Sequence, residues 1–190
     1  MARILVTGGC GYIGSHAIVD LIKHGVDVVS IDNLSNADKR VLFGIETITG
    51  QKVKNYTIDL TDAQAVTKTF DDIGHIDGII HFAAFKSVPE SVAKPLLYYH
   101  NNIQSTANLL AEVQLRNIDT FIFSSSCSVY GQIKTLPVNE NTALGKAECP
   151  YAYTKQIGEQ MICDVASFSQ STWVSLRYFN PVGALSLIHI

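Results

Sequence analysis

The sequence has no long apolar run, no block of basic residues, no internal repeat and no Pro/Ser-rich linker. No apolar run approaches the ~20 residues that a membrane-spanning helix needs, so the chain is not expected to cross a membrane. With 14 Lys and Arg against 17 Asp and Glu, and a net charge of −3, nucleic-acid binding through phosphates is not expected either. At 190 residues without a linker, the chain is expected to form a single domain around one sizeable core.

Cysteine and histidine are present, but not in the spacings that bind metal. Cys10, Cys127, Cys149 and Cys163 show no C-x-x-C spacing. The six histidines form no pair at the spacing of metal ligands on a helix. We therefore expect reduced thiols in a cytoplasmic protein, with no disulfide framework and no metal site. Packing by a small residue, rather than thiol chemistry, is the expected role of Cys10 and Cys127.

Short apolar runs alternate with segments of helical period along the chain. The expected strands are 3–7, 27–31, 53–58, 78–82, 120–124 and 172–178. The expected helices are 14–24, about 37–48, 62–72, about 95–116 and 151–169. Strands that alternate with helices predict βαβ units, and near-continuous apolar strands predict a sheet covered on both faces. The prediction is an α/β fold with a doubly wound parallel sheet of the Rossmann type.

A glycine-rich turn, TGGCGYIGSH (7–16), follows the first expected strand. Gly8, Gly11 and Gly14 have the spacing that lets a backbone approach a pyrophosphate at a helix N-terminus. Asp32 ends the second expected strand, where a carboxylate can bind the ribose of NAD and would repel the 2′-phosphate of NADP. The pattern predicts an NAD site that disfavours NADP. The alternatives are a glycine turn without a ligand and a capping role for Asp32.

The stretch PYAYTKQI (150–157) contains two tyrosines and a lysine. Tyr151 and Lys155 are four residues apart and share one face of a helix, whereas Tyr153 points elsewhere. Tyr151 and Lys155 could therefore act together, and Tyr153 is expected to pack or lie on the surface. Taken alone, the Y-x-x-x-K spacing is also common by chance, so an ordinary aromatic first turn of a helix is the alternative.

Seven blocks in this order resemble the extended short-chain dehydrogenase/reductase superfamily, and within it the UDP-glucose 4-epimerase family. The blocks are TGGCGYIGSH (7–16), DNLSN (32–36), HFAAFKSVPES (81–91), YYHNN (98–102), FSSSCSVYG (123–131), PYAYTK (150–155) and RYFNPVGA (177–184). The glycine turn and Y-x-x-x-K are typical of the whole superfamily, whereas HFA-x-x-K, SSS-x-x-VYG and RYFNP indicate nucleotide-sugar enzymes. Ala84 and Phe85 stand where the family usually has glycine and leucine, and they keep that part of the site apolar.

The resemblance implies which residues form the site. Ser126, Tyr151 and Lys155 would be catalytic, and Ser126, Tyr151 and Asn180 would contact the sugar nucleotide. The implied NAD contacts are Gly8, Gly11, Tyr12, Ile13, Gly14, Asp32, Asn33, Leu34, Ser35, Asn36, Ala37, Asp59, Leu60, Phe82, Ala83, Ala84, Phe85, Lys86, Asn101, Ser126, Tyr151, Lys155 and Phe179. For Lys86 and Asn101 the alternative is an ordinary solvated side chain.

The implied activity is the interconversion of UDP-galactose and UDP-glucose by transient oxidation at C4 of the sugar, with the hydride passing to NAD. Tyr151 would take the hydroxyl proton, and Ser126 would hydrogen-bond the reacting oxygen. A tyrosine with a pKa near 10 is a poor base at neutral pH. We therefore expect Lys155 and the nicotinamide ring to favour the phenolate form of Tyr151.

The resemblance also implies a homodimer in which segments 95–116 and 151–169 pair with their copies. The apolar residues expected to supply that surface are Leu96, Leu97, Leu109, Leu110 and Val113. The match to the family ends at Ala184, and the apolar tail LSLIHI (185–190) is atypical of the family. The expected organisation is thus an NAD-binding domain over 1–184 with the substrate lobe of the family absent. This would be an incomplete form whose own activity is open.

Three other functions remain open at this stage. The first is a 4-epimerase of another nucleotide sugar, such as an N-acetylated or uronic acid form. The second is a nucleotide-sugar 4,6-dehydratase, which is disfavoured because Cys127 and Ser128 stand where those relatives have an Asp-Glu pair. The third is a non-catalytic module that binds NAD without turning over a sugar.

Overall fold

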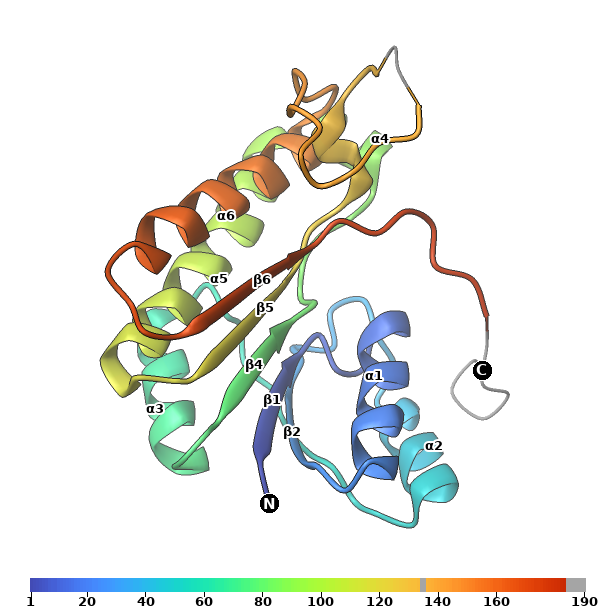
Figure 1. Cartoon of the computed structure of the whole chain (residues 1–190). Coiled ribbons are helices and arrows are strands. Elements are labelled where there is room, and N and C mark those ends of the chain that lie inside the picture. The colour runs from blue at the N-terminus through green and yellow to red at the C-terminus, as the bar shows by residue number, and fades with distance from the viewer. Residues whose placement is uncertain (134–135, 184–190) are drawn as a thin grey trace.

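The computed structural model describes residues 1–133 and 136–183, and it has the expected α/β architecture (Figure 1). Its strands are β1 (Arg3–Thr7), β2 (Asp27–Ile31), β3 (Lys54–Tyr56), β4 (Gly78–His81), β5 (Thr120–Ser124) and β6 (Thr172–Leu176). They form one parallel sheet in the order β3-β2-β1-β4-β5-β6. This is the order of a dinucleotide-binding sheet, and it confirms the predicted doubly wound fold.

Helices cover the sheet from both sides. The five that the sequence predicted are α1 (Tyr12–Lys23), α2 (Arg40–Thr49), α3 (Ala63–Ile73), α5 (Pro95–Arg116) and α6 (Pro150–Ala166). Figure 1 shows α1 and α2 on one face, with α3, α5 and α6 on the other. None of the helices in the described part of the chain combines the length and apolarity that crossing a bilayer requires.

Two short helical segments were not predicted. Helix α4 (Val88–Ala93) begins after Ser87, whose hydroxyl accepts a hydrogen bond from the Glu90 amide. The 3₁₀ helix η1 (Cys127–Tyr130) begins after Ser126, which caps it in the same way. Segments of six and four residues are too short to show a helical repeat of apolar positions, so the periodicity of the sequence could not reveal them.

Two apolar clusters hold the layers together, because successive side chains of a strand point to opposite faces of the sheet. Leu5 and Ile79 contribute to the cluster beneath α3, α5 and α6. Val6 and Val28 contribute to the smaller cluster beneath α1 and α2. Burial on both faces explains why these strands read as near-continuous apolar runs.

The expectation that Leu109, Leu110 and Val113 of α5 supply a dimer surface is wrong. Leu109, Leu110 and Val113 are at most 2% exposed and belong to the cluster beneath α3, α5 and α6. They are occupied by packing within the chain and offer no surface to a partner. Leu96 and Leu97, near the start of the helix, are 79% and 42% exposed.

The parallel arrangement gathers chain segments that are far apart in the sequence. All strands end at the same edge of the sheet, and each is followed there by a connecting segment. Gly8 follows β1, Asp32 follows β2, Phe82 follows β4 and Ser125 follows β5. Arg177 follows β6, which ends two residues earlier than the predicted strand. Ala184 and the tail 185–190 lie outside the described residues.

Candidate cofactor and proton-transfer site

A cavity of about 590 Å³ lies at the carboxyl ends of the strands. Its walls come from the glycine turn, the segments after β2 to β6, helix α5 and the first turns of α6. Every residue that we expected to contact NAD lines this cavity except Leu34, and so does Asn180. Leu34 instead forms a turn, with a positive φ of 60°, in which its amide donates to Asp32 Oδ1.

The glycine turn is closely packed. The Gly8 amide donates to the carbonyl of Ile31, and the Gly8 carbonyl accepts a hydrogen bond from the Gly11 amide. A Cβ on Gly14 would lie 2.2 Å from the Gly8 carbonyl oxygen, and a Cβ on Gly8 would lie 2.7 Å from the Ala83 nitrogen. Side chains are therefore excluded from the positions where the backbone must approach a ligand.

The N-terminus of α1 fits the pyrophosphate of a dinucleotide. Within the described ranges, no side chain caps this end at Gly11, and its first turn contains no acidic residue. The first amide groups of a helix have no partner inside the helix, and they carry the positive end of its dipole. The polarity of this helix end therefore suits an anion in the cavity.

Asp32 lines the cavity directly after β2. Its Oδ2 accepts a hydrogen bond from the Cys10 amide at 3.0 Å, and its Oδ1 accepts one from the Leu34 amide at 2.9 Å. A carboxylate offers about four acceptor positions, so positions remain for sugar hydroxyls. Arg40 belongs to α2 and pairs with Asp38 at 2.7 Å, and neither lines the cavity. Of the two cations nearest to Asp32 in sequence, Lys39 and Arg40, neither lines the cavity, and Arg40 is already paired.

Asn101 and Asn102 have different roles. Asn101 lines the cavity. Asn102 is 5% exposed and holds the loop after β4, since it accepts from the Phe85 amide and donates to the Phe85 carbonyl. The Asn102 amide also donates to the Thr154 hydroxyl of α6. Lys86, at the end of the same loop, is exposed and lines the cavity.

The three residues expected to be catalytic meet where β5 and α6 adjoin. Ser126 caps η1 directly after β5, and its Oγ accepts hydrogen bonds from the amide and the hydroxyl of Ser128. Tyr151 and Lys155 come from the first turns of α6 and line the same cavity. The ammonium nitrogen of Lys155 donates to the carbonyl of Ser124 at 2.7 Å and lies 5.9 Å from the centre of the Tyr151 ring.

Burial dominates the electrostatics of this group. Lys155 is only 4% exposed, and burial lowers its pKa from 10.5 to about 8. Burial also raises the pKa of Tyr151 above its ordinary value, while its hydrogen bond with Ser126 acts in the opposite direction. We expected Lys155 to lower the Tyr151 pKa. In the chain without cofactor, burial instead raises it.

Sequence reasoning missed Tyr178. Its hydroxyl donates to Ser124 Oγ at 2.5 Å, and the residue lines the cavity. Burial is the main cause that raises its pKa. The RYFNP block placed this tyrosine immediately before Phe179, so the block contained the signal, although only Phe179 and Asn180 were taken from it.

The expectations for Tyr153 and Cys10 agree with the structure. Tyr153 is 50% exposed, and its ring packs edge-on against Tyr99. Cys10 is buried, and burial followed by the charge of Asp32 raises its thiol pKa to about 12, which keeps it protonated and unreactive. All four cysteines lie in the described part of the chain and are free thiols.

The strand order, the glycine turn, the acid after β2 and Tyr151 beside the buried Lys155 together define a dinucleotide-binding enzyme domain. Residues 4–187 match the NAD dependent epimerase/dehydratase family, and the chain belongs to that family. NAD is accordingly the cofactor of its family, as the sequence predicted.

Individual relatives agree with this assignment. The chain is 44% identical over 189 residues to the UDP-glucose 4-epimerase of Drosophila melanogaster, and the match covers 95% of this chain and 53% of that protein. The crystal structure of UDP-glucose 4-epimerase from Bifidobacterium longum in complex with NAD+ and UDP is 44% identical. It superposes with a TM-score of 0.93 over 97% of this chain and 55% of that one. The UDP-Glc/GlcNAc 4-epimerase of Campylobacter jejuni is 34% identical with a TM-score of 0.89, over 94% of this chain and 54% of that one. The chain thus spans about half the length of the relatives it matches.

Proposed function

We propose that this chain provides the NAD-binding and proton-transfer part of an enzyme that interconverts UDP-galactose and UDP-glucose by transient oxidation at C4 of the sugar. The observation that supports this most is the meeting of Ser126, Tyr151 and Lys155 in the same cavity as the glycine turn. A cofactor bound along that turn would have its reactive end beside a tyrosine that can exchange a proton.

The proposed roles follow from the chemistry of each side chain. Tyr151 takes the proton of the sugar hydroxyl and later returns it. Lys155, buried and held by the Ser124 carbonyl, places a positive charge near the Tyr151 ring. Ser126 hydrogen-bonds the reacting oxygen. NAD, when bound, would supply the redox chemistry, as the acceptor and then the donor of the hydride at C4.

Other proposed contacts complete the two binding sites. We assign the pyrophosphate to the N-terminus of α1 beside Tyr12 and Ile13, and the ribose to Asp32 and the residues that follow it. Asn180 is the proposed contact to the sugar nucleotide. A UDP-sugar would therefore enter from the side of the cavity formed by the segment after β6.

The two tyrosines of α6 provide a test with a matched control. Tyr151→Phe removes the proposed base but keeps the ring, whereas Tyr153→Phe makes the same change on the exposed face of the helix. NAD binding is measured by calorimetry, and the conversion of UDP-galactose to UDP-glucose is measured with NAD in a full-length form, since the chain covers about half of its relatives. We expect Tyr151→Phe to abolish conversion with NAD affinity retained, and Tyr153→Phe to leave both unchanged.

The outcomes separate the competing functions. Substantial conversion by Tyr151→Phe would assign the proton transfer to another group. NAD binding by the unaltered full-length form without any conversion would favour a non-catalytic module. Preferred conversion of an N-acetylated UDP-sugar would favour the second candidate function, which the resemblance to the Campylobacter jejuni enzyme makes worth testing.

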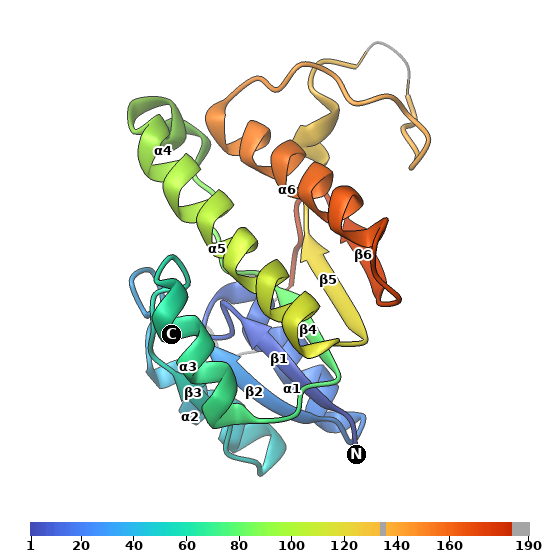
Figure 2. The same ribbon diagram turned by 90° about the vertical axis from the view of Figure 1, so that its left-hand side faces the viewer.

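We also propose a homodimer through the outer surfaces of α5 and α6, two helices that lie side by side (Figure 2). Leu96 and Leu97 of α5 and Tyr153 of α6 expose 79%, 42% and 50% of their surface there. Exposed apolar side chains gathered on neighbouring helices favour burial against a partner. The cytoplasmic location expected from the thiols likewise stays a prediction.

A further inference from the structure

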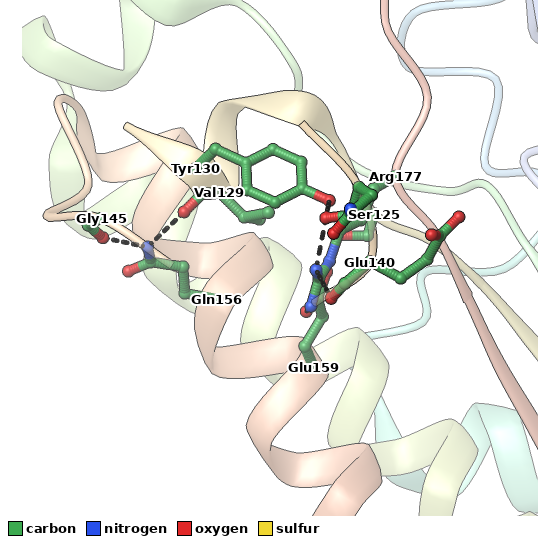
Figure 3. Close-up of polar contacts among 9 residues, drawn as sticks. Ser125, Val129, Tyr130, Glu140, Gly145, Gln156, Glu159 and Arg177 are labelled. Carbon is green, nitrogen blue, oxygen red and sulfur yellow. Dashed lines mark hydrogen bonds and ion pairs between the residues drawn. The ribbon is translucent and has the colours of Figure 1, made fainter. Parts of the chain in front are cut away.

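An ion pair between Glu159 and Arg177, drawn in Figure 3, has a buried carboxylate and a partly exposed guanidinium, and neither residue lines the cavity. Glu159, on α6, is 6% exposed and accepts hydrogen bonds from Arg177 Nε at 2.9 Å and from Arg177 Nη2 at 2.6 Å. The hydroxyl of Ser125 donates to the same carboxylate. Arg177 also donates through Nη1 to the Tyr130 hydroxyl and to the Glu140 carbonyl.

The residues of this network are close in sequence to residues that line the cavity. Ser125 directly precedes Ser126, and Arg177 directly precedes Tyr178. Glu159 follows Lys155 by four residues, so it lies one helical turn further along α6. Together with its Ser125 contact, the ion pair therefore joins the two chain segments that carry Ser126, Tyr151 and Lys155 to the segment that carries Tyr178.

Two more contacts run along the same junction. The amide nitrogen of Gln156, next to Lys155 in the chain, donates to the carbonyls of Val129 at 2.8 Å and Gly145 at 2.7 Å. The Cys127 amide donates to the Tyr178 carbonyl at 3.1 Å. Hydrogen bonds therefore connect the segment after β5 both to α6 and to the segment after β6.

Stability alone is a weak explanation for such a pair. Removing charges from water costs free energy that the attraction between them only partly returns, and apolar replacements of buried pairs are often neutral or stabilising. What a two-armed contact between Arg and carboxylate does provide is a fixed geometry. Here the Arg177 contact fixes α6 against the segment after β6. The Ser125 hydrogen bond to the same carboxylate fixes α6 against the end of β5, where Lys155 donates to the Ser124 carbonyl.

We propose that Glu159 and Arg177 are positioning residues, which hold α6 against the end of β5 so that Tyr151 and Lys155 stay in register with Ser126. The proposal rests on the proposed function for its catalytic meaning. Neither residue lines the cavity, so each acts through its neighbours and not through contact with the reactants.

The chain contains a closely matched control. Glu112 of α5 is 4% exposed, pairs with Arg116 at 2.6 Å, and accepts a hydrogen bond from the Thr67 hydroxyl. It thus shares burial, an Arg partner and a hydroxyl donor with Glu159. None of Glu112, Arg116 and Thr67 lines the cavity, and they tie α5 to α3 instead of to the end of β5.

The test compares two double variants, Glu159→Gln with Arg177→Met and Glu112→Gln with Arg116→Met. Each removes one charge of either sign, so the net charge is unchanged. The readout is the pKa of Lys155, followed by NMR of chains with ¹³C-labelled lysine and assigned through the signal missing in Lys155→Met. This readout needs no turnover, so it stays informative if the proposed activity is not found. Thermal unfolding shows how much stability each double variant loses.

We expect the Glu159/Arg177 variant to raise the Lys155 pKa by about one unit, because a loosened helix admits water around the ammonium group. The Glu112/Arg116 variant should lose a similar amount of stability and leave the Lys155 pKa unchanged. An unchanged Lys155 pKa in the first variant, or an equal shift in both, overturns the proposal. If the first variant does not fold, Arg177→Lys, which keeps the charge but loses the two-armed contact, is read in the same way.

Discussion

Replacement of Gly14 by alanine should separate cofactor binding from folding. The added Cβ would lie 2.2 Å from the Gly8 carbonyl oxygen, whereas ordinary van der Waals contacts begin at 3.4 Å. Either the glycine turn or α1 must therefore move by about 1 Å. Gly8 cannot yield easily, because its amide is hydrogen-bonded to Ile31 and a Cβ on it would already meet the Ala83 backbone.

The magnitude follows from how such overpacking behaves. Forcing an extra methyl group into a tight contact costs about 1–3 kcal/mol of stability. A displacement of that size at the N-terminus of α1 also moves the amides proposed to bind the pyrophosphate. We expect the NAD dissociation constant of Gly14→Ala to rise at least tenfold, which corresponds to about 1.4 kcal/mol or more.

Gly50→Ala is the matched control. Gly50 has a φ of +72°, and a Cβ there would meet nothing within 4 Å. Its alanine variant should lose about 1 kcal/mol through backbone strain alone, with unchanged NAD affinity. Chemical denaturation gives the free energy of unfolding, and calorimetry gives the NAD affinity of both variants. Equal NAD affinities for Gly14→Ala and the unaltered chain would refute the close-packing argument.

Three further predictions concern other residues. Asp32→Ala should narrow the difference in calorimetric affinity between NAD and NADP, and equal or tighter binding of NADP by the unaltered chain would contradict the role of Asp32. Burial lowers the pKa of His81 from 6.5 to about 3, so the unfolded chain gains a proton there that the folded chain does not. The free energy of unfolding should therefore fall as pH drops from 6.5 towards 3, with a contribution of up to about 1.4 kcal/mol per pH unit that His81→Gln removes and exposed His24→Gln does not. Light scattering should show a dimer at micromolar concentration that Leu97→Glu weakens, and a monomer for the unaltered chain would count against the homodimer.

The fold was predictable because its signals are local. The apolar runs 3–7, 27–31 and 120–124 have the predicted length in the structure, whereas the predicted strand 53–58 is shortened to β3. Helices longer than about three turns repeat the apolar spacing often enough to be recognised. Helix α4 and η1 repeat it less than twice, so only their serine caps mark them.

The site was predictable as a set of residues but not as a set of contacts. Gly8, Asp32 and Tyr151 could be placed because each follows directly from the end of a strand or begins a helix. The contacts of Glu159 with Ser125 and Arg177 join residues 34 and 18 positions apart, and no sequence period connects them. The direction of the Tyr151 pKa depends on burial in the folded chain, which a helical spacing of four residues cannot report.

The buried ammonium group of Lys155 lowers the stability of the folded domain at neutral pH. In the unfolded chain this lysine keeps its ordinary pKa of 10.5, whereas burial lowers its folded pKa to about 8. Below pH 8 the folded chain must therefore keep a charge that its surroundings disfavour, at a cost of about 3 kcal/mol. The cost fades as pH rises from 8 to 10.5, because the folded chain then releases the proton before the unfolded chain does. At neutral pH, part of the stability that the two apolar clusters supply is thus used to keep one lysine charged beside Tyr151. A chain selected for stability alone would have an apolar residue there.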